Sequence, residues 1–205
     1  MRIDISKIPA QTYTPQTLYN TMHVAHIGYR LKNQGMAMAC DWFHLLRDRR
    51  GELYNPWSAT SISVIEIGCG NGRLCTFLAR HGLVVTGVDI YDNKDVYVRD
   101  GYKFIKHDLM QTPYPFKDNE LDYCLSFDVL EHLHPRWGTF HIADMLRVSD
   151  EVIGTIACFR HEPLHPNVKT PEEWQKIISD IGNAKFKVFE ERKGKTILFF
   201  AKKKE

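Results

Sequence analysis

The sequence has no long apolar run, no strong excess of charge of one sign and no regular cysteine framework. Its first residues, Met1 to Lys7, contain no apolar stretch of the length that a signal peptide or a membrane span needs. The formal net charge of +2 gives the molecule as a whole no strong attraction to nucleic acid or to anionic lipid. We therefore expect a cytoplasmic protein with no membrane partner, and nucleic acid stays open as a partner.

Cysteine and histidine are present without the spacings of a disulfide or zinc framework. Five cysteines are an odd number and include no C-x-x-C pair: Cys40, Cys69, Cys75, Cys124 and Cys158. We predict that they are buried thiols. Of the ten histidines, His132 with His134 and His161 with His165 lie close together in the sequence. Because zinc sites usually add thiolates or an H-E-x-x-H helix to such histidines, we predict no metal.

Strand and helix patterns alternate along the chain from residue 62. Apolar, β-branched runs predict strands at 62–67, 83–89, 103–106, 121–126, 152–157, 186–190 and 196–200. Helical patterns lie at 72–81, at 135–148 and from Thr170 onward. This alternation is typical of an α/β fold with a doubly wound, mostly parallel sheet, here seven-stranded and ending in an antiparallel hairpin. We expect this domain in residues 59–205 and an N-terminal arm and helical cap in residues 1–58.

The first predicted strand ends in a glycine-rich turn that leads directly into a helix. Gly68, Gly70 and Gly72 alternate there, and glycine lets a backbone turn sharply and come close to a ligand. The dinucleotide pattern G-x-G-x-x-G is not met, because position 73 is Arg73, and the Gly-Lys-Ser/Thr of a P-loop is missing. The turn therefore predicts either a ligand site of another kind or a tight turn that binds nothing.

Acidic residues follow the next two predicted strands, at the sheet edge where ligands of such folds bind. Asp89 ends the second strand and could accept hydrogen bonds from ribose hydroxyls, or it could simply open an exposed turn. Asp108 follows the third strand and could receive the amino group of adenine, or it could cap a turn. Each residue alone is compatible with both interpretations.

A longer segment, Asp128-Val129-Leu130-Glu131-His132-Leu133, follows the fourth predicted strand. With it, the chain resembles the class I S-adenosylmethionine-dependent methyltransferases. The turn Glu66-Ile67-Gly68-Cys69-Gly70-Asn71-Gly72 is similar to the E/D-x-G-x-G-x-G motif of that family, and many small-molecule members have a similar segment after strand four. The resemblance covers roughly residues 60–200 and implies that strand seven lies antiparallel between strands five and six.

The resemblance also implies which residues bind S-adenosylmethionine, the expected cofactor. Residues of the first turn would surround its methionine part: Glu66, Gly68, Cys69 and Gly70. Asp89 would bind the ribose, and Ile90 would lie against one face of the adenine. Asp108 and Leu109 would contact the edge of the base. Phe127 and Asp128 would lie beside the amino acid and the sulfonium.

Histidines near these residues are candidates for a proton acceptor, which the reaction needs only if the acceptor must lose a proton. His132 follows strand four, and an imidazole has a pKa near neutrality. His132 could instead pack against the cofactor or cap the next helix. After strand five, His161 or His165 could accept a proton and Arg160 could hold an anion. That segment could equally be a proline-stiffened, solvated loop.

The function that we expect is methyl transfer to oxygen or nitrogen of a small molecule. A nucleic-acid or nucleotide methyltransferase is one alternative. Against it, the sequence has neither an Asn/Asp-Pro-Pro-Tyr/Phe motif after strand four nor a Pro-Cys motif. A protein that binds the cofactor without transferring methyl is the other alternative, because the binding motifs would be the same.

Overall fold

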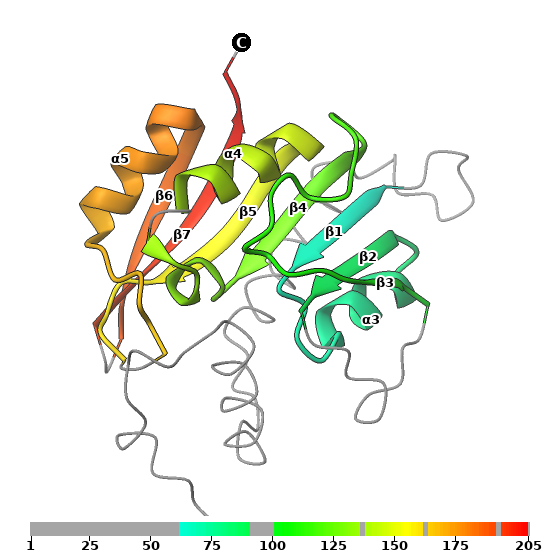
Figure 1. Cartoon of the computed structure of the whole chain (residues 1–205), viewed down its shortest axis with the longest axis horizontal. Coiled ribbons are helices and arrows are strands. Elements are labelled where there is room, and N and C mark those ends of the chain that lie inside the picture. The colour runs from blue at the N-terminus through cyan, green and yellow to red at the C-terminus, as the bar shows by residue number, and fades with distance from the viewer. Residues whose placement is uncertain (1–61, 91–100, 136–137, 162–163, 192–193, 205) are drawn as a thin grey trace, which may run out of the picture.

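A computed structural model describes residues 62–204, apart from 91–100, 136–137, 162–163 and 192–193. The predicted arm and cap at 1–58 lie outside these residues, as does nearly all of the polar segment that joins the second and third strands. Within the described part, the main elements are one mixed sheet and the helices that cover its two faces (Figure 1). No helix in this part of the chain is long and apolar enough to cross a membrane.

The sheet has seven strands in the order β3-β2-β1-β4-β5-β7-β6. The first five are β1 Ser63–Ile67, β2 Val84–Asp89, β3 Lys103–Lys106, β4 Leu121–Phe127 and β5 Ser149–Ala157, and they pair in parallel. The hairpin of β6 Gly182–Glu191 and β7 Gly194–Lys203 adds β7 antiparallel to β5. The predicted fold class is therefore confirmed, with strand seven between strands five and six.

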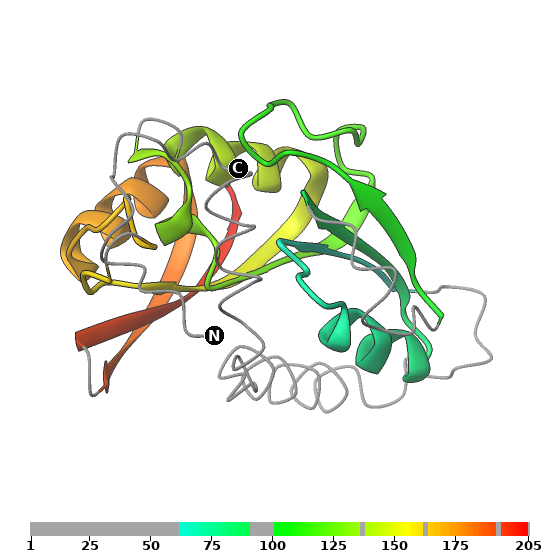
Figure 2. The same ribbon diagram turned by 60° about the horizontal axis from the view of Figure 1, so that its bottom comes forward.

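Helices cover both faces of this sheet. Figure 2 shows α3 Arg73–Arg80 on the opposite side of the sheet from α4 Gly138–Val148 and α5 Pro171–Ile181. The alternation of side chains along β1 explains this arrangement: Ile65 and Ile67 pack into the core under α4 and α5, whereas Val64 packs into the core under α3. The sheet is thus buried on both faces, which explains why its central strands are continuously apolar.

The strand ends differ from the prediction in ways that backbone pairing explains. Strand β5 begins at Ser149 rather than 152, and each strand of the hairpin has ten residues. The hairpin pairs from Gly182 with Lys203 to Glu191 with Gly194, well beyond its apolar centre. Backbone hydrogen bonds continue there through polar residues, and such residues carry no hydrophobic signal. The start of α5 is as predicted, because Thr170 and Glu173 form a reciprocal capping box.

The parallel register brings several strand ends to one edge. Ile67 at the end of β1 is level with Val88 of β2, and Phe127 at the end of β4 is level with Thr155 of β5. The helix after β1 and the helix after β4 lie on opposite faces, so the crevice between these two strand ends is the switch point where ligands of such sheets bind.

Candidate functional site

The glycine-rich turn is held against the end of β2. The N–H groups of Gly68 and Cys69 donate to the carbonyl of Val88 at 2.8 and 3.0 Å. Gly68, Gly70 and Gly72 all have positive φ, at 72°, 51° and 71°. A Cβ on Gly68 would meet Val129 Cγ2 at 2.5 Å, whereas a Cβ on Gly70 would meet no heavy atom of the described residues within 4 Å. Gly68 is therefore required for packing, whereas the described residues leave room for a Cβ at Gly70.

Asp89 joins this turn to the second strand. The N–H of Gly70 donates to Asp89 Oδ2 at 2.8 Å, and Asp89 is buried. Asp89 is thus not the exposed turn residue that the sequence left as an alternative. A carboxylate has lone pairs for several donors, so this bond orients the group without using up its capacity to accept others. Ile90, the next residue, is half-buried.

Glu66 lies under the glycine turn, on the same face of β1 as helix α3. Its Oε2 accepts a hydrogen bond from Cys75 Sγ at 2.9 Å, and the carboxyl is buried. The pKa of Glu66 is raised to about 8: burial is the main cause, the hydrogen bond from Cys75 opposes it, and the charge of Asp89 adds to it. At neutral pH the carboxyl is therefore mostly protonated. Cys69, the turn residue between Gly68 and Gly70, is also buried, and a Cβ on Gly87 would meet the sulfurs of Cys69 and Cys75 at 2.9 Å each.

Asp108 and Leu109 follow β3, as predicted, with contacts of their own. Asp108 Oδ1 accepts from the N–H of Met110 at 2.9 Å, which is the turn-capping contact that the sequence left as an alternative. Leu109 is buried in the core under α4 and α5. Their predicted contact with a base edge stays a prediction.

Asp128 has an unusual backbone at the end of β4. Its φ is 55°, a left-handed conformation that is uncommon outside glycine. Thr155 of β5 stabilises this conformation: its hydroxyl donates to Asp128 Oδ1 at 2.8 Å, and its carbonyl accepts from the N–H of Asp128 at 3.1 Å. Burial raises the pKa of Asp128, and the hydroxyl of Thr155 lowers it. Phe127, just before it, is half-buried against the core under α3. A strained residue fixed by its neighbours is typical of a functional position.

Glu131 and His132 lie in η4, Leu130–His132, a short 3₁₀ turn that follows Asp128. Glu131 is fully buried: Oε1 accepts from the N–H of Ala157 at 3.1 Å, and Oε2 has no hydrogen-bond partner in the described part of the chain. Burial raises the pKa of Glu131 well above its usual range, and the charge of Asp128 adds to this shift. His132 Nδ1 pairs with the carbonyl of Leu164 at 2.6 Å. The sequence indicated no role for Glu131.

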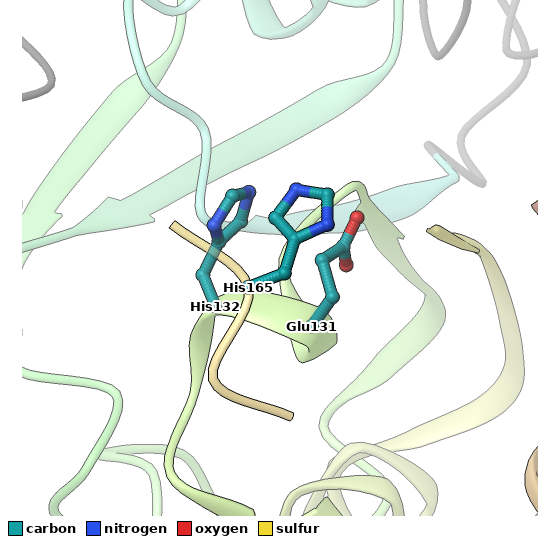
Figure 3. A group of neighbouring side chains, drawn as sticks. All are labelled: Glu131, His132 and His165. Atoms are coloured by element: carbon teal, nitrogen blue, oxygen red, sulfur yellow. The ribbon is translucent and has the colours of Figure 1, made fainter. Parts of the chain in front are cut away.

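His165, from the loop after β5, completes this group (Figure 3). The rings of His132 and His165 meet edge to face, with centroids 4.9 Å apart. His165 Nδ1 pairs with the carbonyl of Phe159 at 2.9 Å, and burial lowers its pKa to about 4. The ring of His161 lies 5.3 Å from that of His165, whereas His134 and Arg160 are exposed. The structure therefore brings three of the four predicted histidines together, with His165 rather than His134 next to His132.

The cysteines of the described chain are free thiols, as predicted. Cys69, Cys75 and Cys124 are buried and Cys158 is half-buried, while Cys40 lies outside the described residues. Burial raises the pKa of Cys75 well above its usual range. A thiol in this state is a poor nucleophile, which makes these cysteines packing residues.

The fold and the strand-end site define a class of protein. A parallel sheet with a closing β5-β7-β6 hairpin, a glycine turn after β1 and acidic residues after β2 and β4 form the class I methyltransferase fold. Residues 65–148 match the family model described as "Methyltransferase domain". Residues 65–148 are therefore a methyltransferase domain, and the fold that contains them is that of the class I S-adenosylmethionine-dependent methyltransferases.

Two proteins are similar to it in sequence. A fatty-acid O-methyltransferase of Mycolicibacterium smegmatis is 29% identical over 126 residues, which are 57% of this chain and 42% of that protein. A putative methyltransferase, 235L, of Invertebrate iridescent virus 6 is 25% identical over 123 residues, 57% of this chain and 46% of that protein. The match spans less than half the length of each of these relatives.

Solved structures share the fold at low identity. The 1,6-didemethyltoxoflavin-N1-methyltransferase of Burkholderia thailandensis, with 1,6-didemethyltoxoflavin and S-adenosylhomocysteine bound, has a TM-score of 0.66 at 15% identity, covering 100% of this chain and 94% of that one. The magnesium protoporphyrin IX methyltransferase of Synechocystis PCC 6803, with S-adenosylhomocysteine bound, has a TM-score of 0.59 at 18% identity, covering 83% of this chain and 84% of that one.

Proposed function

We propose that this protein transfers a methyl group from S-adenosylmethionine to an oxygen or nitrogen atom of a small molecule. The observation that carries the proposal is the hydrogen bond between the Gly70 N–H and Asp89, which joins the glycine turn to the acidic end of β2. Backbone donors and a buried carboxylate at one switch point suit a ligand with a ribose and a charged amino-acid tail.

The residues at this edge fit the cofactor. The turn has no side chain at Gly70, so a ligand can approach its backbone closely, and Asp89 accepts hydrogen bonds from ribose hydroxyls. Glu66, Gly68 and Cys69 line the methionine end, and Ile90 packs on the adenine. Asp108 and Leu109 lie at the base edge, while Phe127 and Asp128 lie beside the amino acid and the sulfonium. The buried carboxyl groups of Glu66 and Asp128 become more stable as anions next to a cationic ligand, since an opposite charge lowers a carboxyl pKa.

The bound cofactor supplies an activated methyl group, so the chain mainly positions the reactants and excludes water. Asp128, held by the hydroxyl of Thr155, favours binding of the cationic sulfonium and takes no part in bond making. Where the acceptor must lose a proton, His132 or His161 accepts it. Both lie beyond the carboxyl ends of β4 and β5, on the side from which an acceptor approaches.

The small-molecule acceptor is supported by the proteins that are similar to this chain. The names of these proteins point to a fatty acid, 1,6-didemethyltoxoflavin and magnesium protoporphyrin IX as their acceptors. They differ widely in shape, and each offers an oxygen or nitrogen atom to the methyl group. The acceptor class is therefore broad, and the fold does not narrow it further.

A labelling experiment tests this function. The full chain is incubated with methyl-labelled S-adenosylmethionine and, separately, with fatty acids, planar nitrogen heterocycles, RNA, DNA and a small-metabolite extract. We expect label in a small molecule and none in nucleic acid, and less label with the control variant Asp89→Asn, in which cofactor binding should be weaker. Label in RNA or DNA alone would overturn the acceptor class. Tight binding of the cofactor by calorimetry, with no label in any fraction, would overturn methyl transfer itself.

A further inference from the structure

Three potential metal ligands converge from two separate segments of the chain. Glu131 and His132 come from the turn η4, and His165 comes from the loop between β5 and α5. One ligand atom from each lies within 4.8 Å of the others. Figure 3 shows the ring of His165 between the ring of His132 and the carboxylate of Glu131. Sequence proximity did not predict this group, because His165 is 33 positions after His132.

Backbone carbonyls fix the tautomer of both histidines. A carbonyl oxygen can only accept, so Nδ1 of His132 donates its hydrogen to Leu164 and Nδ1 of His165 donates to Phe159. In a neutral imidazole bonded in this way, Nε2 carries the lone pair. An outer hydrogen bond from the second ring nitrogen to a carbonyl is the usual support of a histidine that binds a metal.

The carboxylate of Glu131 is also suited to bind a metal ion, because one of its oxygens is held in place and the other can coordinate. Ala157 holds Oε1 through a backbone hydrogen bond of 3.1 Å, and Oε2 is buried without a partner in the described part of the chain. A buried carboxylate oxygen without a partner is costly, and native proteins rarely keep one without a reason. A cation bound to Oε2 would remove that cost.

Asn167 holds the two segments together. It is fully buried, its N–H donates to the carbonyl of Glu131 at 3.1 Å, and its side-chain amide donates to the carbonyl of Leu130 at 2.9 Å. The loop that carries His165 is therefore tied directly to the turn that carries the other two ligands. Such preorganisation reduces the ordering that a bound ion would require.

We propose that Glu131, His132 and His165 bind one divalent transition-metal ion of the zinc type. Two imidazoles and one carboxylate suit Zn²⁺, Co²⁺, Fe²⁺ or Mn²⁺, whereas Mg²⁺ and Ca²⁺ prefer all-oxygen sites. Ligand atoms about 2.0–2.2 Å from an ion lie about 3–4 Å apart, so side-chain shifts of about an ångström complete the site. This site departs from the prediction of no metal, which was based on sequence spacing alone.

Three protein ligands leave one position of the ion open, and an oxygen of the methyl acceptor can occupy it. This role rests on the proposed function. Asp128, the residue proposed to lie beside the sulfonium, precedes the turn that carries Glu131 and His132, and the N–H of His132 donates to the carbonyl of Val129, the residue after Asp128, at 3.0 Å. The ion would thus lie at the acceptor side of the reacting methyl group. It would also occupy His132 and leave His161 as the proton acceptor.

Metal binding is tested on the full chain without any assay of methyl transfer. The protein is freed of metal with a chelator and titrated with Zn²⁺, Co²⁺ and Mg²⁺ by calorimetry, and the visible absorption of Co²⁺ reports the ligand set. We expect one Zn²⁺ or Co²⁺ per chain and no binding of Mg²⁺ at micromolar concentration. The variants His165→Ala and Glu131→Gln should each weaken Zn²⁺ binding at least about 100-fold, more than the loss of an outer partner costs.

His134→Ala is the matched control, because His134 is exposed and lies two positions after His132. It should bind Zn²⁺ like the unmodified chain. Circular dichroism of Glu131→Gln, which keeps the size of the side chain and an acceptor for Ala157, shows that the fold is intact. Absence of Zn²⁺ binding by the unmodified chain, or equal binding by all three variants, would overturn the site. Calorimetry of S-adenosylmethionine binding to the metal-free chain tests the cofactor site by itself. It therefore distinguishes either result from a failure of the proposed methyltransferase function.

Discussion

The backbone N–H of Gly70 donates a 2.8 Å hydrogen bond to Oδ2 of Asp89, across the ends of two adjacent strands. Gly70 belongs to the turn after β1, and Asp89 is the last residue of β2. The two residues are 19 positions apart, and each alone was compatible with a site or with a simple turn. Their direct contact joins the glycine turn to the acidic end of β2, the two features from which a cofactor site was predicted.

Replacement of Asp89 should weaken cofactor binding. Hydrogen bonds to a charged group contribute about 1.5–3 kcal/mol, so Asp89→Ala should lower the affinity for S-adenosylmethionine at least about tenfold. Calorimetry measures the change, and Asp89→Asn shows how much of it is due to charge. Asp118→Ala is a control, since that exposed carboxylate pairs with Arg147 away from this edge. An unchanged affinity in Asp89→Ala would refute the assignment of the ribose to this residue.

Gly70→Ala should lower the affinity for the cofactor. Its effect on the stability of the fold should be limited to the cost of backbone strain. The φ of 51° costs an alanine about 1–2 kcal/mol, and the new methyl group meets no atom of the described residues. It would instead occupy the space next to the turn. Gly82→Ala is the matched control, because Gly82 also has positive φ, 87°, in an exposed turn after α3.

Both glycine variants should lose a similar amount of stability in urea unfolding, and only Gly70→Ala should lose affinity for S-adenosylmethionine. If the two variants bind the cofactor equally well, the cofactor does not bind against the turn at Gly70.

The buried carboxyl of Glu66 should make stability depend on pH. Its pKa is raised from 4.5 to about 8, so between these values the folded chain binds more protons than the unfolded chain. The free energy of unfolding therefore falls as pH rises through this range, by at most about 1.4 kcal/mol per pH unit from this group. Glu66→Gln removes this dependence, so its stability relative to the unmodified chain should increase from pH 5.5 to pH 7.5. Parallel stability curves for the two chains would show that Glu66 is ionised in the fold.

His132→Ala should reduce kcat more than it weakens cofactor binding, whether His132 is a proton acceptor or a metal ligand. The two roles differ in a second measurement. Loss of a ligand also reduces the Zn²⁺ content by elemental analysis, whereas loss of a base leaves it unchanged. Equal kcat for the variant and the unmodified chain would make His132 a packing residue.

His161→Ala should lower kcat at least about tenfold, since general bases commonly contribute 10²–10⁴-fold. The sharper measurement is the acid limb of the pH profile of kcat, which should disappear with the imidazole that produces it. His134→Ala, with an exposed histidine removed, should keep both kcat and the limb. An acid limb that persists in His161→Ala would assign the proton transfer to another group.

Much of the fold was predictable because its signals are local. The apolar runs at 62–67 and 121–126 and the capping box at Thr170 each depend on a few neighbouring residues, and the structure confirms them. The ends of β6 and β7 were predicted too short, because backbone pairing extends beyond the apolar residues that mark a strand.

The candidate site was predictable only in part. The positions of Glu66, Asp89 and Asp128 at strand ends follow from the motif, but the protonation of Glu66 and the left-handed backbone of Asp128 do not. Burial under α3 causes the first, and the hydroxyl of Thr155 on the neighbouring strand stabilises the second. Both causes lie in other segments of the chain.

The sequence by itself determined the class of this protein, because the glycine turn and the strand-end acids are short motifs in a fixed order. Only the tertiary structure decided which of these residues touch. It joined Gly70 to Asp89, and it brought His165 rather than His134 to Glu131 and His132. The physical reason is that strand pairing and the buried contacts of Asn167 set these distances, and they link segments about 20 to 40 residues apart.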